Sequence, residues 1–229
     1  MFRNLTFRRV LGSVLGNVGI GLGVSIFLYS GMGLDPYSSM CMSLSEVFSM
    51  KYGTFLLLFN FVLFAVELIF GRKYIGLGTL LNWVFVGYIV QFFQWLVLSR
   101  VPEPGNLGIR FLIMIPAILI ISLAVSLYQI ADVGVSPYDS MALIMTDHFP
   151  IKYFWNRIIA DVLCCLVGVI ACGAFTKEFW AAHTGYAIGQ VGLGTVLCAF
   201  CLGPFVSFFN EKISKPFING GRKKGTSGK

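Results

Sequence analysis

Residues 33–40 read Gly-Leu-Asp-Pro-Tyr-Ser-Ser-Met, and residues 134–141 read Gly-Val-Ser-Pro-Tyr-Asp-Ser-Met. A second pair of matching stretches lies further along, because residues 76–79 and 192–195 are both Gly-Leu-Gly-Thr. The offset is 101 residues for the first pair and 116 for the second, so the later half carries extra residues near its end. Matches in this order indicate an internal repeat, and they predict a fold built from two related halves.

The composition predicts an all-α polytopic membrane protein. Of 229 residues, 57% are hydrophobic and only 12% are charged. A soluble domain carries about 25% charged residues, so roughly half of the usual solvating charge is missing. The mean hydropathy is +0.81. A water-soluble globular protein, a disordered protein and a nucleic-acid-binding module are therefore excluded, and the lipid bilayer is the expected surrounding.

Six stretches approach the length of about 20 apolar residues that a membrane-spanning helix needs. They are Val10–Tyr29, Thr54–Phe70, Ile75–Leu98, Phe111–Ile130, Tyr153–Cys172 and Gly185–Phe209. Two shorter and more polar stretches, residues 35–50 and 136–149, lie between them and are not expected to cross lipid alone. The expected organisation is one membrane domain over residues 1–229, with repeat 1 at 9–98, repeat 2 at 108–210 and a polar cytoplasmic tail at 211–229.

The number of crossings decides how the halves are related. If the short stretches enter and leave on one side, each half crosses three times and the second half is inverted. If they cross, each half crosses four times and the halves are parallel. Basic residues do not separate these alternatives, but the polarity of the short stretches favours six crossings and an inverted repeat. Transporters often use inverted repeats with broken helices and place the substrate site between them.

Charge and glycine patterns add two expectations. The net charge of +7 is concentrated at the ends of the chain, with Arg3, Arg8 and Arg9 before the first span and Lys212, Lys215, Arg222, Lys223 and Lys224 after the last. Positive flanks favour the cytoplasmic side, so both termini are expected to face the cytoplasm. The pairs Gly12/Gly16 and Gly19/Gly23 predict close packing of the first helix against a neighbour.

The short stretches carry the candidate site. Asp35-Pro36 and Ser136-Pro137 are typical of helix starts, since Asp and Ser cap helices and Pro suits the first helical position. A helix N-terminus attracts anions, and two such ends are expected to face one central cavity. Tyrosine and serine side chains after each proline are expected to line it. The predicted substrate-binding residues in these stretches are Asp35, Pro36, Tyr37, Ser38, Ser39, Ser136, Pro137, Tyr138, Asp139 and Ser140.

Polar residues inside the spans complete the candidate set. Charges within a membrane are costly and usually face a partner, the protein interior or water. Arg157 and Asp161 are four residues apart, so a local ion pair is an alternative to a role in binding. Asn60 occupies the position of Asp161 in the first half, and all three are predicted to bind substrate. A protonatable Glu67 or Asp161 is a further candidate for coupling transport to protons.

No catalytic, cofactor or metal site is predicted. The histidines His148 and His183 stand alone, and the six cysteines lie in or beside apolar runs, where buried thiols behave as small hydrophobes. The Cys198-x-x-Cys201 pair has no further ligand spaced to complete a zinc site. The chain also lacks the nucleotide-binding and hydrolase motifs, which disfavours an ATP-driven pump or a hydrolase.

The paired Gly-x-x-Pro-Tyr-x-Ser-type stretches, the Gly-Leu-Gly-Thr stretches and the size of the chain resemble the YitT/YczE-like bacterial integral membrane proteins. The resemblance covers about residues 9–210. It implies a small protein of the bacterial cytoplasmic membrane with about six helices. It implies no substrate and no catalytic residue.

Three functions remain open at this stage. The favoured one is a permease or exporter of a small anionic or zwitterionic solute, bound between the repeats. A second is a membrane-embedded binding subunit that docks on a separate energising protein. A third is a membrane enzyme acting on lipid with Asp132, Asp139 or His148. The expected partners are a small-molecule solute and the bilayer, without nucleic acid, and a homo-oligomer or an energising partner protein is left open.

Overall fold

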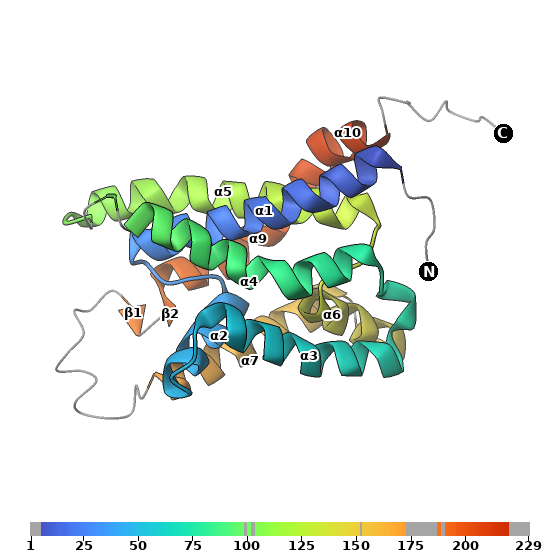
Figure 1. Ribbon diagram of the computed structural model, residues 1–229, viewed down its shortest axis with the longest axis horizontal. Helices are drawn as coiled ribbons and strands as arrows, with labels where there is room; N and C mark the ends of the chain where they lie inside the picture. Colours follow the sequence, from blue (N-terminus) through green and yellow to red (C-terminus); the bar gives the residue numbers. More distant parts are fainter. Residues whose placement is uncertain are drawn as a thin grey trace.

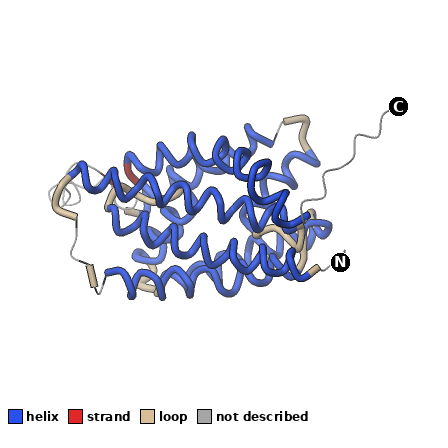
Figure 2. The backbone as a smooth tube through the Cα atoms, turned by 90° about the horizontal axis from the view of Figure 1, so that it is seen from above, coloured by secondary structure: helices blue, strands red, loops and turns tan. Residues whose placement is uncertain are grey.

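The computed structural model describes residues 6–98, 100–101, 104–151, 153–172, 187–188 and 191–219. Almost all of them are helical, as the tube view shows (Figure 2). The elements are α1 (Phe7–Ser30), α2 (Pro36–Val47), α3 (Tyr52–Phe70), η1 (Arg72–Tyr74), α4 (Leu77–Leu98), α5 (Leu107–Ala131), α6 (Pro137–His148), α7 (Tyr153–Ala171), β1 (Ala187–Ile188), β2 (Val191–Gly192), α9 (Leu193–Phe209), the π-helical turn η2 (Asn210–Ser214) and α10 (Lys215–Asn219).

The expected all-α membrane fold is confirmed. Within the described residues, five helices are long and apolar enough to cross a membrane, namely α1, α3, α4, α5 and the helix that runs from Leu193 to Ile218. The remaining predicted span, Tyr153–Cys172, coincides with α7, which is 19 residues long. The two short polar stretches form α2 and α6, helices of 12 residues each.

One predicted boundary near the end of the chain is wrong. The last span was expected from Gly185, but α9 begins at Leu193, because Val191–Gly192 pair antiparallel with Ala187–Ile188. The amide of Gly192 donates to Thr195 Oγ1 at 3.0 Å, which caps the helix there. Residues 211–219, the described part of the predicted polar tail, are helical, and within them Ser214 and Ile218 are buried. His183 and residues 220–229 lie outside the described residues.

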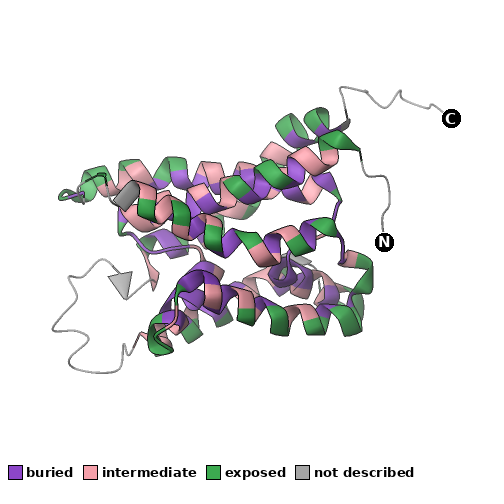
Figure 3. Ribbon diagram, viewed as in Figure 1, coloured by how far each residue is buried: buried purple, intermediate pink, exposed green. Residues whose placement is uncertain are grey.

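The helices form two layers (Figure 1). One layer holds α1, α4, α5 and α9, with α1 packed on both α4 and α5, and α5 packed on α9. The other holds α2, α3, α6 and α7, with α2 packed on α7 and α6 packed on α3. Eight of the 12 residues of α2 and six of the 12 residues of α6 are buried (Figure 3), so both short helices lie largely inside the protein.

Helix directions within the first layer are opposed between the two halves of the chain. Asn82 of α4 donates to Asn17 of α1 at 2.8 Å, and Ser25 of α1 donates to the carbonyl of Val90 further along α4, so these two helices run parallel. In contrast, Gly12 faces Ala131 and Gly23 faces Ile121, so α1 and α5 run antiparallel. Opposed directions are what inverted halves require, while duplication of the chain itself remains a prediction from the sequence.

The predicted close packing of the first helix is confirmed at the α1–α5 contact. A Cβ atom built on Gly16 would lie 2.7 Å from the carbonyl oxygen of Ala124 and 2.8 Å from Cβ of Tyr128. Glycine therefore allows the two backbones to approach within direct contact. In lipid, where burial of apolar surface from water is absent, such packing is a main source of helix association.

Each short helix begins after a non-helical segment around Gly33 or Gly134, called a break here, and each break is hydrogen-bonded by the other half of the chain. Gly33 and Gly134 have positive φ angles of 100° and 132°, which glycine adopts at little cost. The amide of Gly194 donates to the carbonyl of Met32 at 2.8 Å, and the amide of Gly78 donates to the carbonyl of Val133 at 3.0 Å. The Gly-Leu-Gly-Thr stretch of each half thus binds the break of the other.

Replacing Gly16 by leucine is expected to destabilise the fold by about 1–3 kcal/mol, because the added side chain must push α1 away from α5. The measurement is the unfolding free energy in mixed detergent and denaturant. Gly203→Ala is the matched control in a membrane helix, since no atom lies within 4 Å of a Cβ built there. Equal stability of the two variants would contradict the proposed role of the α1–α5 contact.

Candidate functional site

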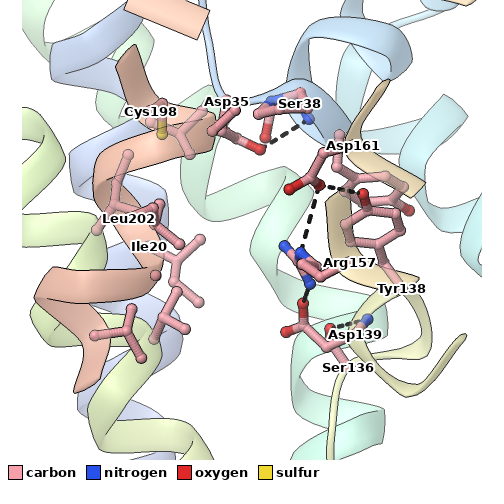
Figure 4. Close-up of a pocket in the computed structure, with 18 of the residues that line it drawn as sticks. Ile20, Asp35, Ser38, Ser136, Tyr138, Asp139, Arg157, Asp161, Cys198 and Leu202 are labelled. Carbon is pink, nitrogen blue, oxygen red and sulfur yellow. Dashed lines mark hydrogen bonds and ion pairs between the residues drawn. The ribbon is translucent and has the colours of Figure 1, made fainter. Parts of the chain in front are cut away.

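A cavity of about 590 Å³ lies between the two layers. Among the described residues, its charged side chains come from the layer of short helices: Asp35 at the start of α2, Asp139 on α6, and Arg157 and Asp161 on α7. The facing layer contributes mainly apolar side chains, among them Ile20 of α1 and Leu202 of α9 (Figure 4). The cavity therefore has one charged wall and one largely apolar wall.

Two stacked tyrosines join the halves at the charged wall. The rings of Tyr37 and Tyr138 are 4.1 Å apart at their centroids and 11° from parallel. The hydroxyl of Tyr37 donates to Asn60 Oδ1 at 2.6 Å, and the hydroxyl of Tyr138 donates to Asp161 Oδ1 at 2.6 Å. Each tyrosine is thus fixed by a residue of the following helix in its own half. The rings pack against each other at the centre of the molecule.

Arg157 lies between two carboxylates. Its guanidinium binds Asp139 and lies 3.4 Å from Asp161 Oδ1, so the expected local ion pair is present and a second acid joins it. The same group lies over the ring of Tyr138, at 4.7 Å from the centroid. The side chains of Asp139 and Asp161 are only 11% and 12% exposed, which makes the arginine their counter-ion in a poorly solvated setting.

The N-termini of both short helices are capped by their own side chains. Asp35 Oδ2 accepts from the amide of Ser38 at 3.1 Å, and Ser136 Oγ accepts from the amide of Asp139 at 3.1 Å. These bonds satisfy helix-end donors that the sequence analysis assigned to an anionic ligand. The other carboxylate oxygen of Asp35, Oδ1, is buried and has no hydrogen-bond partner.

Most of the sequence-predicted site residues line the cavity. Those that do are Asp35, Pro36, Tyr37, Ser38, Asn60, Ser136, Tyr138, Asp139, Arg157 and Asp161. The cavity lining does not include Ser39, Pro137 and Ser140, which are fully buried. Ser140 Oγ donates to the carbonyl of Pro137 at 2.8 Å, so it serves the first turn of α6. Glu67 is also fully buried outside the lining, where α3 packs on α6.

The cavity includes residues that the sequence analysis did not select. Tyr128 near the end of α5 is 1% exposed, and its hydroxyl has no hydrogen-bond partner. Asn210 Oδ1 at the end of α9 is also buried and unpartnered. Asn82 of α4 and Gln129 of α5 are polar residues within predicted spans, and they line the same cavity. The short motifs gave no signal for Tyr128 or Asn210, which reach the cavity only through the packing of α5 and α9.

Outside the cavity, the first half binds the end of α6 through exposed groups. Lys73 Nζ and Tyr74 Oη each lie 2.8 Å from Asp147 Oδ2, and these two donors lower the pKa of the Asp147 carboxyl below its usual range. His148 beside it contacts the carbonyl of Ile144 at 2.9 Å. Among the residues that the structure describes, no group of His, Cys, Asp and Glu could hold a metal ion.

Comparison with known proteins places the chain in a family. Residues 7–211 match the model of a family of unknown function, DUF6198, and the chain belongs to that family. It is 24% identical to the uncharacterized membrane protein YczE of Bacillus subtilis, over 84% of this chain and 81% of that protein. It is 25% identical to an uncharacterized protein of Haemophilus influenzae, over 86% and 80% of the two chains. No solved structure matches the chain.

Removal of the Arg157 charge tests whether this ion-pair cluster holds the charged wall together. Arg157→Gln is expected to lower the unfolding free energy by about 3 kcal/mol, because two poorly solvated carboxylates lose their counter-ion. Adding Asp139→Asn and Asp161→Asn to that variant is expected to restore part of the loss. Arg9→Gln is the control, since Arg9 pairs with Asp132, whose side chain is 80% exposed, and such pairs contribute at most about 1 kcal/mol. Equal losses in the two single variants would contradict this account.

Proposed function

We propose that this membrane protein of the DUF6198 family is a permease or exporter that carries a small solute through the cavity between its two halves. The observation that carries the proposal is the cavity itself. It holds about 590 Å³ inside a bundle of membrane-length helices, and its polar wall is built from both halves of the chain. Such a volume lies within the range that small-molecule sites occupy.

The position of the short helices supports transport. Discontinuous helices that end inside the membrane are a recurrent way to build solute sites in transporters, because their freed backbone groups and end charges face a cavity. Here α2 and α6 each begin at the cavity, and Tyr37 and Tyr138 follow their first residues. Non-helical backbone at membrane depth is tolerated where other parts of the protein cover it. The hydrogen bonds from Gly194 and Gly78 to the two breaks provide this cover.

Charged residues within the membrane add further support. An Asp or Arg inside a bilayer is expensive and is usually retained for function. Asp139, Arg157 and Asp161 form a connected group that faces the cavity rather than a lipid-exposed surface. A purely structural bundle of this size gains little from such a group, since apolar packing at the same positions is often at least as stable.

The proposed function is not enzymatic. The three residues considered for a lipid enzyme each have separate partners: Asp132 binds Arg9 at the surface, Asp139 binds Arg157 in the cavity, and His148 contacts Ile144 at the end of α6. A general acid or base needs its partner within hydrogen-bond reach, and these contacts do not assemble the three groups into one such site. The need for a separate energising protein is decided by the transport assay below.

A ligand screen followed by an uptake assay tests the proposal. The purified protein is heated in detergent with amino acids, organic acids, organic amines and phosphorylated metabolites. A transported solute is expected to stabilise the protein by about 2.7 kcal/mol when its concentration is about 100 times its Kd. The stabilising solute is then expected to enter liposomes that contain this protein alone.

Two matched variants test whether binding and uptake depend on the cavity. Tyr37→Ala combined with Tyr138→Ala is expected to abolish both stabilisation and uptake, because the stacked rings and their two hydrogen bonds are lost. Tyr88→Ala, an exposed tyrosine of α4 that does not line the cavity, is expected to change neither. Binding without uptake would contradict a lone permease and would favour a binding subunit that needs a partner.

A further inference from the structure

We propose that the cavity binds a small organic cation, a protonated amine with an apolar body, and that Asp35 is its counter-ion. The inference names the substrate class of the site proposed above and rests on that cavity being a solute site. It departs from the anionic or zwitterionic solute that the helix-start pattern predicts, because the structure shows how the charges of the site are paired.

The balance of charge favours a cation. The charged residues among the described cavity lining are three aspartates and one arginine. Arg157 is held by Asp139 and Asp161, so it already serves two carboxylates. Asp35 Oδ2 accepts a hydrogen bond from the amide of Ser38, and Asp35 is not one of the two carboxylates in these ion pairs of Arg157. A buried carboxylate without a cation is costly, and a ligand that brings a positive charge removes that cost.

The unpartnered polar atoms of the lining residues also favour a cation. Asp35 Oδ1 and Asn210 Oδ1 are buried acceptors without a donor, and the hydroxyl of Tyr128 is buried without a partner of either kind. A buried polar atom without a hydrogen bond calls for a ligand or an ordered water. An ammonium group offers donors only, which the Asp35 carboxylate needs, whereas a carboxylate or phosphate brings acceptors only and does not match it.

The apolar wall of the cavity indicates that the rest of the ligand is apolar. Figure 4 shows Ile20 and Leu202 facing the charged wall across the cavity, and Val24 and Ile121 belong to the same apolar lining. A fully solvated cation such as a metal ion gains nothing from such a surface. An amine that carries a short aliphatic or aromatic body fits both walls, because its charge reaches the aspartate while its carbon atoms pack on the apolar side chains.

The capping role of Asp35 allows a clean test. Asn is as good an N-cap as Asp, so Asp35→Asn keeps the bond to the Ser38 amide and removes only the charge. Asp132→Asn is the matched control, because Asp132 is mostly exposed and lies outside the cavity. The probes are 2-phenylethylamine, 2-phenylethanol and 3-phenylpropionate, which share a phenyl body and differ in the charge of the head group.

Affinities of the three probes are measured by calorimetry on the purified protein in detergent. The native protein is expected to bind 2-phenylethylamine at least about tenfold more tightly than the alcohol or the acid. Asp35→Asn is expected to weaken amine binding by about tenfold to a hundredfold, the range that one charged hydrogen bond supplies. The Asp132→Asn protein is expected to bind the amine with native affinity.

Several results would overturn the proposal: binding of 3-phenylpropionate as tight as that of the amine, unchanged amine binding by Asp35→Asn, or no binding of the amine at all. Uptake into liposomes separates this inference from the proposed function. Amine binding without uptake supports the cation site and contradicts the permease. Uptake of the acid with no binding of the amine supports the permease and overturns the cation site.

Discussion

Every backbone donor and acceptor inside a bilayer needs a partner from the protein, and the whole structure depends on how two breaks meet that need. The chain leaves helical geometry around Gly33 and again around Gly134. Each break is bound by the Gly-Leu-Gly-Thr stretch of the other half, through the amides of Gly194 and Gly78. Because the bonds are reciprocal, neither half can satisfy its own broken segment, and the two halves must assemble for either short helix to begin inside the protein.

These reciprocal hydrogen bonds position the candidate site, but the two halves contribute different side chains to it. Tyr37 and Tyr138 meet at the centre because the short helices that carry them begin at the two breaks. At the offset of 101 residues, Leu56 stands where the second half has Arg157, and Asn60 where it has Asp161. Tyr138 of the second half therefore joins a charged network, whereas Tyr37 of the first half bonds to the neutral Asn60. Asp35 is the charged residue that the first half contributes to the cavity lining. The two halves thus enclose one cavity, and the wall formed by α2, α6 and α7 carries its charged side chains.

The sequence predicted the framework well and the chemistry of the site less well. Apolar length set the spans, since a bilayer fixes the length of a crossing helix, and five described helices meet that criterion. The Asp-Pro and Ser-Pro helix starts were predictable because capping is local. The start of α9 was not, because it depends on strand pairing at Val191–Gly192. Contacts between different helices, such as Arg157 of α7 with Asp139 of α6 or the approach of Tyr128 to the cavity, depend on tertiary packing, which spacing along the chain does not encode.

Access to the cavity from both sides of the membrane is the most direct test of transport. Leu202 lines the cavity, faces its charged wall and is partly exposed, so a Leu202→Cys variant in a chain whose six native cysteines become serine or alanine reports on that position alone. Membrane vesicles of both orientations are treated with a membrane-impermeant, cationic thiol reagent. Alternating access predicts that the introduced thiol at position 202 is modified from either face and that 2-phenylethylamine slows both reactions. Modification from one face only, or from neither, would contradict the account of this protein as a transporter.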